Sequence, residues 1–492
     1  MVEFTDRASV EAWCKERTRE EVIVFAVRNA ASVYPVVSRP SEWSERHFDF
    51  HSCRAILTAA VTIMFDENAV TTAAGSAAIS ESSEYAASID ETFAVLSAYA
   101  AAAVYACAAA SAVGAGTTRT DASVAASGAA SAAAGIFSSH TNELFRASDI
   151  ASQIASDGVA GVMKAPLWNG EAPEELIADW HVIRNERSKD MKVWGFWIDW
   201  YEGLLAGRAP DWELWREVAL IDDAIWQMGP EAVAEAIAGI KAALTSKRLP
   251  LAEDLVADPV TGLFSVVPRD IANLPLLAAS LGQVSDAVDD VLAEDANGLR
   301  ETSSDILKLR RTVERYANDP QRVEMDMTSV SASLLRQVAC EDLPASAAIL
   351  GLQQVVQQTA DGLRATHPEI AANRALLQGQ ARQALSDDML EQIAQAGPLL
   401  EAISDVGLRE EMRDDVYELT QAMRVGAPPL GGVLRDGGDE IVRIGGRGAR
   451  MMLMLRKSPA LVHKLEASTG YKAASIVGTL WVLVGLLWAI FL

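Results

Sequence analysis

Twenty residues at the C-terminal end, Ala473 to Leu492, carry no charge and constrain the chain more than any other feature. At about 1.5 Å per residue, a helix of this length covers the roughly 30 Å hydrocarbon core of a bilayer. Its large apolar side chains surround the helix instead of forming one stripe, which disfavours the alternative of a helix buried in a protein core. We therefore expect a single transmembrane helix at 473–492 that anchors the chain by its tail.

The distribution of charge predicts the side of the membrane. The formal net charge is −25, yet residues 425–472 carry a net charge of +4. Basic residues beside a span favour the cytoplasmic side, and each gains about 1 kcal/mol near anionic lipid. They are Arg435, Arg443, Arg447, Arg450, Arg456, Lys457, Lys464 and Lys472, opposed by Asp436, Asp439, Glu440 and Glu466. The N-terminal residues resemble no secretory signal. We expect an anchor in the bacterial inner membrane, with the soluble part in the cytoplasm.

The negative net charge of the whole chain also disfavours one class of protein, the nucleic-acid binders. A nucleic-acid binder needs a basic face for phosphates, so no nucleic-acid partner is expected. The expected partners are the lipid bilayer, a further copy of the chain and an unidentified protein. The four cysteines, Cys14, Cys53, Cys107 and Cys340, form no CxxC pair. This usage fits a reducing compartment and small buried side chains.

Clusters of proline and glycine divide the chain into segments. We predict an Ala/Trp-rich helical module at 1–248, a linker at 249–274 and a helical bundle at 275–424. A Gly-rich basic juxtamembrane segment at 425–472, read as a flexible linker, then leads to the anchor at 473–492. The stretch from Val256 to Phe264 within the first linker has the composition of a turn.

The apolar residues of the predicted bundle follow a helical period. Steps of three and four residues connect Leu277, Leu281, Val284, Val288 and Val291, then Ile306, Leu309, Val313 and Tyr316, then Met327, Val330 and Leu334. Pro320, Pro344, Pro368 and Pro398 suit the first turns of helices. These interruptions favour antiparallel helices over one continuous coiled coil. The predicted fold is all-α: multi-helix cytoplasmic bundles with a single C-terminal transmembrane helix.

An alanine-rich, uncharged run covers residues 92–118. Alanine has a high helix propensity but contributes little transfer free energy, so the run favours closely packed helices. A second membrane span or a pore-forming segment is the alternative.

Eight of the twelve tryptophans fall between Trp168 and Trp226. Trp194, Trp197, Trp200 and Tyr201 are spaced by about one helical turn and form an aromatic ridge, with Asp199 and Glu202 at its polar edge. One interpretation is a core that packs over the alanine-rich helices. The other is an exposed surface that binds a partner through Trp194, Trp197, Asp199, Trp200, Tyr201 and Glu202.

Three motifs in the first 245 residues carry a resemblance. They are an acidic N-terminal helix from Phe4 to Trp13, the turn Pro166-Leu167-Trp168, and the W-x-D-W-Y-E-x-x-L-x-G pattern from Trp197 to Gly207. Ile225-Trp226 and Gly229-Pro230 follow the same order. With these motifs the chain resembles a recurrent group of bacterial helical proteins of unknown function. The group often has a basic residue where Leu204 stands, so the resemblance leaves an ion pair with the neighbouring acids in doubt. It implies a helical module and no activity.

Candidate catalytic and metal-binding chemistry is sparse. His47 and His51 have the spacing of two ligands on one helical face, with Cys53 nearby, but no second ligand cluster accompanies them. Adjacent acids point about 100° apart on a helix, which suits solvated faces and first turns better than a carboxylate dyad; the pairs are Asp222-Asp223, Asp289-Asp290, Asp387-Asp388 and Asp414-Asp415. The Gly445 to Arg450 run lacks the end of a phosphate-binding loop and is read as linker. No cofactor or metal is expected, and enzymatic activity is disfavoured.

Small residues line one side of the tail helix: Ala474, Gly478, Gly485 and Ala489, with Val482 between them. Such faces let membrane helices pair closely, although glycine and alanine are common in these helices anyway. We expect a tail-anchored, non-enzymatic protein that binds partners or self-assembles as a sensor or effector, for instance in bacterial stress or phage defence. The alternatives are a membrane-tethered scaffold without toxicity and an enzyme with an unrecognised site.

Overall fold

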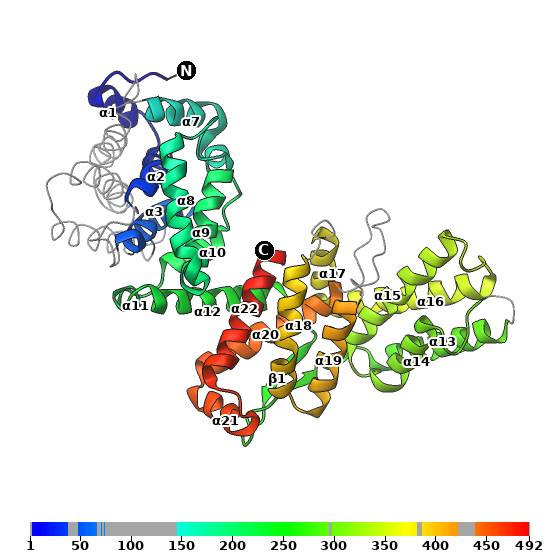
Figure 1. Cartoon of the computed structure of the whole chain (residues 1–492). Helices are drawn as coiled ribbons and strands as arrows, with labels where there is room; N and C mark the ends of the chain where they lie inside the picture. Colours follow the sequence, from blue (N-terminus) through cyan, green and yellow to red (C-terminus); the bar gives the residue numbers. More distant parts are fainter. Residues whose placement is uncertain are drawn as a thin grey trace. The chain divides into compact units, whose positions relative to one another are not determined.

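The computed structural model describes residues 2–37, 48–65, 70, 73, 145–294, 298–380, 386–421 and 438–491. The chain divides into two compact units, Met1–Ile240 and Lys241–Leu492. Nearly all elements in the described ranges are helices (Figure 1), which confirms a mainly helical fold. The alanine-rich run at 92–118 lies outside the described residues.

The first unit is a helical assembly built around α2. Its elements are α1 (Arg7–Lys15), α2 (Arg19–Val37), α3 (Phe48–Met64), α7 (Phe145–Lys164), α8 (Glu174–Arg187), the 3-10 helix η1 (Ser188–Asp190), α9 (Met191–Ala206), α10 (Trp212–Ala219), α11 (Asp223–Gln227) and most of α12 (Pro230–Arg248). α2 packs against α3, α7 and α8, and α8 packs against α9. Since α2 and α3 are covered on almost every side, they form the centre of this unit.

Aspartate caps explain where several of these helices begin. The side chains of Asp190, Asp211 and Asp222 accept hydrogen bonds from backbone N–H groups in the first turns of α9, α10 and α11. A cap of this kind satisfies an N–H that has no partner inside the helix. The predicted first-turn role of an acidic pair is thus confirmed at Asp222. It is wrong at Asp415, whose carboxylate is fully buried.

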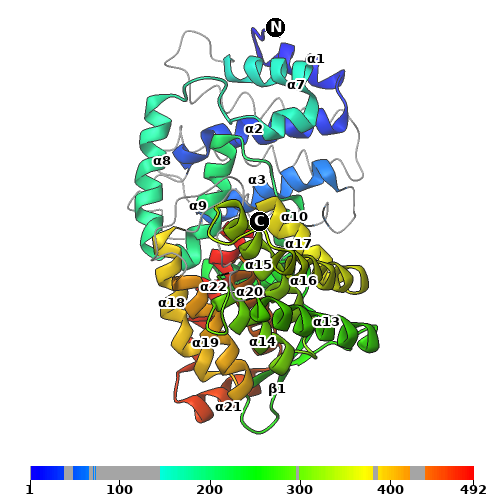
Figure 2. The same ribbon diagram turned by 90° about the vertical axis from the view of Figure 1, so that its right-hand side faces the viewer.

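The second unit begins with a short hairpin and continues as helices. Its elements are β1 (Glu253–Ala257), β2 (Phe264–Pro268), α13 (Leu274–Ala293), α14 (Ser304–Arg315), α15 (Pro320–Ala339), α16 (Ala347–Thr366), α17 (Pro368–Gln380), α18 (Asp387–Ala402), α19 (Val406–Gln421), α20 (Gly438–Lys457), α21 (Pro459–Thr469) and α22 (Ala473–Phe491). Figures 1 and 2 both place α15 and α16 side by side.

The predicted helical stepping is confirmed in α13 to α16. The residues on the predicted stripe of α13 are all buried, and they share one core with Ile306, Leu309, Met327, Val330 and Leu334. Two of the four prolines stand at helix starts as predicted, Pro320 in α15 and Pro368 in α17. Pro344 lies before the α16 cap, Ser346, and Pro398 lies inside α18, so those two predictions are wrong.

The predicted linker at 249–274 contains an antiparallel hairpin instead. Its turn has the predicted chemistry: the Asp258 carboxylate accepts hydrogen bonds from the N–H groups of Val260 and Thr261, and Gly262 has a φ of +76°. β2 is tied down because the Phe264 N–H donates to the Ile403 carbonyl and the Phe264 carbonyl accepts from the Asp405 N–H. These bonds to the junction of α18 and α19 make the segment part of the core.

The described part of the predicted juxtamembrane linker is also ordered, as helices α20 and α21. The Gly445 to Arg450 run lies inside α20. The glycines pack closely there: a Cβ on Gly446 would lie 2.9 Å from Cδ1 of Leu251, and one on Gly448 would lie 2.6 Å from Cδ2 of Leu483. The flexible-linker interpretation is therefore wrong for this helix, and the glycines serve helix contacts.

The tail helix α22 lies against the second unit in this structure, beside α20, α18, α21 and α17 (Figure 1). It buries one stripe: Ile476, Leu480, Leu483, Val484 and Trp488. Within the described ranges, no single helix meets the length and hydropathy of a membrane span. The segments Pro459–Thr469 and Ala473–Leu486, bent by 107° at the break between them, meet that requirement only as a pair.

Candidate functional site

The aromatic ridge of α9 forms core in the first unit. Trp197, Trp200 and Tyr201 are buried, whereas Trp194 is half-buried and its ring lies 3.9 Å from the Arg187 guanidinium. Trp197 contacts Phe50 and Trp226 at centroid distances of 6.0 and 6.1 Å. These partners come from α3 and α11, so the ridge packs on bulky aromatic rings.

The polar residues of the predicted binding surface point away from that core. Asp199 pairs with Arg208 at 2.8 Å, and Glu202 pairs with Arg184 at 2.7 Å. Both pairs are solvent-exposed, with 62% of the Asp199 side chain accessible. The acids therefore have basic partners other than a residue at position 204, and the structure does not bring them together with the rings in one cleft.

The sequence motif around Gly207 has a structural explanation. Gly207 ends α9 with a φ of +70°, and a Cβ there would lie 2.4 Å from the Pro166 nitrogen. The turn it touches is further fixed because the Leu167 N–H donates to the Leu204 carbonyl. Arg28 and Arg146 donate to the carbonyls of Pro166 and Leu167. These bonds join the Pro-Leu-Trp turn to the end of α9.

Of the three residues weighed as metal ligands, only Cys53 has a side chain among the described residues. His47 and the side chain of His51 lie outside the description, and the buried Cys53 thiol donates to the Tyr34 hydroxyl at 3.0 Å. No group of three His, Cys, Asp or Glu side chains suited to a metal occurs in the described ranges.

The small-residue face of α22 lies on the side away from the buried stripe. Ala474 is exposed, Val482 has 48% of its surface accessible, and no atom lies within 4 Å of a Cβ built on Gly478 or Gly485. The side chain of Ala489 lies outside the description. The fold of the second unit thus leaves this face open.

A buried cluster of charges joins β1, α15, α19 and α20 in the second unit, and sequence reasoning missed it. We call it the arginine cluster: Arg322, Arg443 and Arg447 with Glu253, Asp326, Glu411 and Asp415. All of these side chains are at most 2% exposed except Glu411, at 17%. Removing each of these charged groups from water costs several kcal/mol, so each needs a partner of opposite charge and hydrogen bonds to be stable in the interior.

Arg447 is the centre of the arginine cluster. Its Nε and Nη2 atoms donate to the two carboxylate oxygens of Glu253, each at 2.7 Å, and Nη2 also reaches Glu411 at 2.7 Å. Arg443 pairs with Glu411 at 2.6 Å and with Asp415 at 3.2 Å. Two arginines predicted to face anionic lipid are therefore inside the protein. The two-point fork to Glu253 is the strongest geometry for such a pair.

Arg322 extends the cluster into the helical bundle. Its Nε atom donates to Asp326 at 3.1 Å and its Nη1 atom to Asp415 at 3.2 Å, and the Thr312 hydroxyl donates to Asp326 at 2.6 Å. Each of the three helices supplies two charges four residues apart, at 322 and 326, 411 and 415, and 443 and 447. That spacing puts both charges on one helical face and was the only signal available in the sequence.

The cluster changes the titration of its carboxylates. Burial raises the pKa of Glu253, but the neighbouring Arg447 outweighs it and the pKa of Glu253 is lowered overall. Burial raises the pKa of Asp319, which lies beside the cluster, to about 6, against the lowering effect of Arg443. These ion pairs connect β1, α15, α19 and α20 through opposite charges.

We expect Asp319 to make the stability of the second unit pH-dependent. Its pKa in the folded protein, about 6, exceeds the ordinary value of 3.8, so the folded state binds the proton more tightly. Its contribution is most favourable at low pH and is lost as pH rises through about 6. Between about pH 5 and pH 7.5 the free energy of unfolding should fall by about 1.5 kcal/mol relative to an Asp319→Asn variant. Urea unfolding of both proteins measures this difference, and a pH-independent difference would contradict it.

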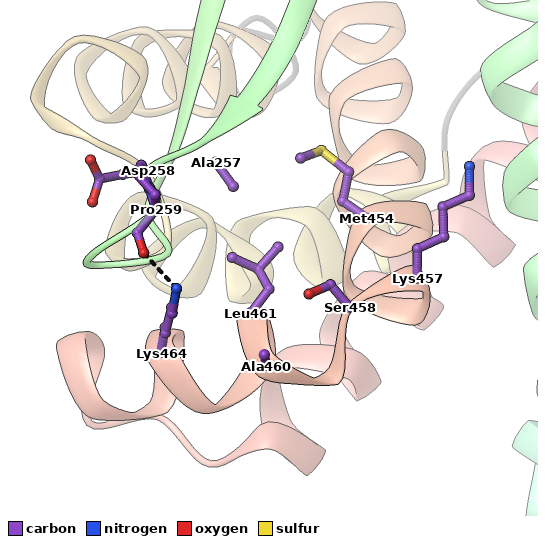
Figure 3. A pocket seen from close by; sticks show the side chains of 9 residues that line it. All are labelled: Ala257, Asp258, Pro259, Met454, Lys457, Ser458, Ala460, Leu461 and Lys464. Atoms are coloured by element: carbon purple, nitrogen blue, oxygen red, sulfur yellow. Dashed lines mark hydrogen bonds between the residues drawn. The ribbon is translucent and has the colours of Figure 1, made fainter.

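A cavity of about 380 Å³ lies where the hairpin turn meets the junction of α20 and α21 (Figure 3). It is lined by Ala257, Asp258, Pro259, Met454, Lys457, Ser458, Ala460, Leu461 and Lys464. The lining combines apolar side chains with two lysines. One carboxylate, that of Asp258, also belongs to the lining.

Comparisons with protein-family models, with characterised proteins and with solved structures found no match for this chain. The resemblance of the first 245 residues to bacterial helical proteins stays a prediction.

Proposed function

We propose that this protein is a non-enzymatic helical protein that works at a membrane surface, tethered by α22, with its two units on the cytoplasmic side of a bacterial inner membrane. The observation that carries the proposal is α22 itself. The helix has no charged residue over Ala473–Phe491, and the protein fold covers only one side of it. The uncovered side includes Val482 and the two glycines.

Transfer of α22 from the protein to lipid is physically reasonable. Its buried stripe leaves one apolar environment for another, whereas the surfaces of α18 and α20 that it covered become exposed to water, which opposes the transfer. Its outer side leaves water for hydrocarbon, which is favourable by about 25 cal/mol per Å². The bilayer and the second unit therefore compete for the same helix, and the bilayer covers more of it.

The same proposal gives the units a role in recognition. Pairing of inserted α22 helices through Ala474, Gly478 and Gly485 would bring copies of the chain together. We favour a sensor or effector whose assembly perturbs the membrane, as in a stress or phage-defence response, over a passive scaffold. The resembling bacterial proteins give no activity to transfer.

A charge on the outer side of α22 tests the tether. The Val482→Lys variant should keep its fold, because position 482 is 48% exposed in the docked helix. A lysine at the centre of a span costs about 2.5–3.5 kcal/mol, so the ratio of membrane-bound to soluble protein should fall by on the order of a hundredfold. Carbonate-resistant sedimentation of cell membranes measures this ratio.

Val256→Lys is the matched control, because Val256 is 45% exposed on β1 and receives the same charge outside α22. Val482→Lys protein that stays in the membrane fraction as well as the control would overturn the tether. A potential-sensitive dye on the same strains separates the two roles: depolarisation that Val482→Lys abolishes supports an effector, and an unchanged potential supports a scaffold.

A further inference from the structure

The cavity beside α21 is held in shape by bonds between the hairpin and α21. The Lys464 ammonium donates to the Pro259 carbonyl at 2.5 Å, and the Ser468 hydroxyl donates to the Thr261 carbonyl at 2.6 Å. A Cβ on Gly262 would lie 3.0 Å from Lys464, so the turn and the helix are in close contact. These contacts hold α21 against the hairpin turn of the second unit.

The charges around this cavity suit an anion. Figure 3 shows Lys464 and Lys457 at opposite ends of the lining. The ammonium of Lys464 uses one of its three donors on Pro259, which leaves two for a ligand. The acid in the lining, Asp258, offsets one of the two lysines, so two positive charges against one negative leave the lining at +1. Its Oδ1 atom accepts hydrogen bonds from Val260 and from both the N–H and the hydroxyl of Thr261.

A hydroxyl and an apolar wall complete the lining. Ser458 stands at the N-cap of α21, yet its side chain makes no capping hydrogen bond. Figure 3 shows this hydroxyl on the Leu461 side of the residue. Met454 and Leu461 give the cavity its apolar surface. Two ammonium groups, a hydroxyl and aliphatic side chains match a phosphate that is joined to hydrocarbon.

The position of the cavity beside the tail helix indicates that the phosphate belongs to a membrane lipid. α21 meets α22 at a bend of 107°, with Gly470 at a φ of +74° between them. Only three residues, 470–472, separate α21 from α22, so α21 stays close to the membrane surface when α22 is inserted. With Arg443 and Arg447 buried, the exposed basic residues of this region are concentrated at Arg456, Lys457, Lys464 and Lys472.

We propose that this cavity binds the phosphate headgroup of an anionic phospholipid through Lys457 and Lys464. The inference rests on the proposed membrane function and assigns a site to it. The bound headgroup holds α21 at the interface and orients the second unit on the membrane. Charge complementarity supports it, because a chain of net charge −25 places exposed lysines at this cavity beside its apolar tail.

Flotation of the full chain with lipid vesicles tests the site. The measured quantity is the ratio of binding to vesicles with phosphatidylglycerol over vesicles of phosphatidylcholine alone. Two charges near anionic lipid contribute about thirtyfold by diffuse attraction alone. The Lys457→Gln/Lys464→Gln variant also removes the direct contacts to the headgroup, so it should lower the ratio by more than that. Circular dichroism checks that it stays folded.

Two controls separate a site from diffuse attraction. Arg456→Gln/Lys472→Gln removes the same charge from the same segment outside the cavity lining, and it should lower the ratio several-fold less. Ala460→Phe fills the cavity at unchanged charge and should lower the ratio. Equal losses from both charge variants, with no effect of Ala460→Phe, would show a diffuse basic surface and overturn the site.

The remaining outcomes distinguish the site from the function it rests on. A chain that floats with neither vesicle overturns the membrane function itself. A chain that floats equally with both vesicles retains the membrane function and overturns the headgroup site. If inorganic phosphate at constant ionic strength removes the preference of the wild-type chain, the cavity is a free-phosphate site and the lipid assignment is wrong.

Discussion

The Arg447→Met variant is expected to lose about 3–5 kcal/mol of the stability of the second unit. The substitution keeps much of the side-chain volume but removes the cation that pairs with Glu253 and Glu411. Glu253 is 2% exposed and would keep a buried charge whose main partner is gone. Native-state hydrogen exchange of the amides in α20 and β1 measures the effect in this unit alone.

Two variants serve as controls for this loss. Arg413→Met on α19 removes an exposed ion pair with Glu401 and should cost about 1 kcal/mol or less. The double variant Glu253→Leu/Arg447→Met removes both charges of the fork and should recover part of the loss, since no lone Glu253 carboxylate remains. An Arg447→Met protein no less stable than the Arg413→Met protein would show that the cluster does not hold α20.

The Trp197→Ala variant is expected to lose about 3–5 kcal/mol of the stability of the first unit. Its indole is buried among Phe50, Trp200 and Trp226, so truncation leaves a cavity lined by rings that are themselves tightly placed. Ten of the twelve tryptophans lie in this unit, so intrinsic fluorescence during urea unfolding reports mainly on it.

Conservative changes at the polar edge provide the contrast. Asp199→Asn and Glu202→Gln remove exposed ion pairs, and each should change stability by about 1 kcal/mol or less. If these variants were as stable as the wild type but no longer bound a partner, the ridge would be a recognition surface after all. A Trp197→Ala protein as stable as the wild type would contradict its place in the core.

Local patterns predicted helices well because helix formation is local. The stripe from Leu277 to Val291 becomes one buried face of α13, as its steps of three and four residues require. Turn chemistry at Asp258 and Gly262 was also readable. The hairpin itself was missed, since its second strand is secured by Ile403 and Asp405, far along the chain.

The interpretation of 438–457 as a flexible linker was wrong because amino-acid composition does not show which residues a segment packs against. Glycine is frequent in loops, yet Gly446 and Gly448 lie in a helix and pack closely against Leu251 and Leu483. The basic character of the segment was likewise misleading. A net charge counted from the sequence treats Arg443 and Arg447 as surface residues. In the fold both are buried and pair with carboxylates of the arginine cluster.

The sequence alone determined the helical character of the chain, the aromatic content of its first unit and the uncharged helix at 473–491, because each depends on neighbours within a few turns. Tertiary structure decided the arginine cluster, in which Arg447 and Glu253 meet across 194 positions. It also decided which side of α22 is covered. Hydropathy assigns that helix to an apolar environment, and a protein surface lined by α18 and α20 meets that condition as a bilayer does.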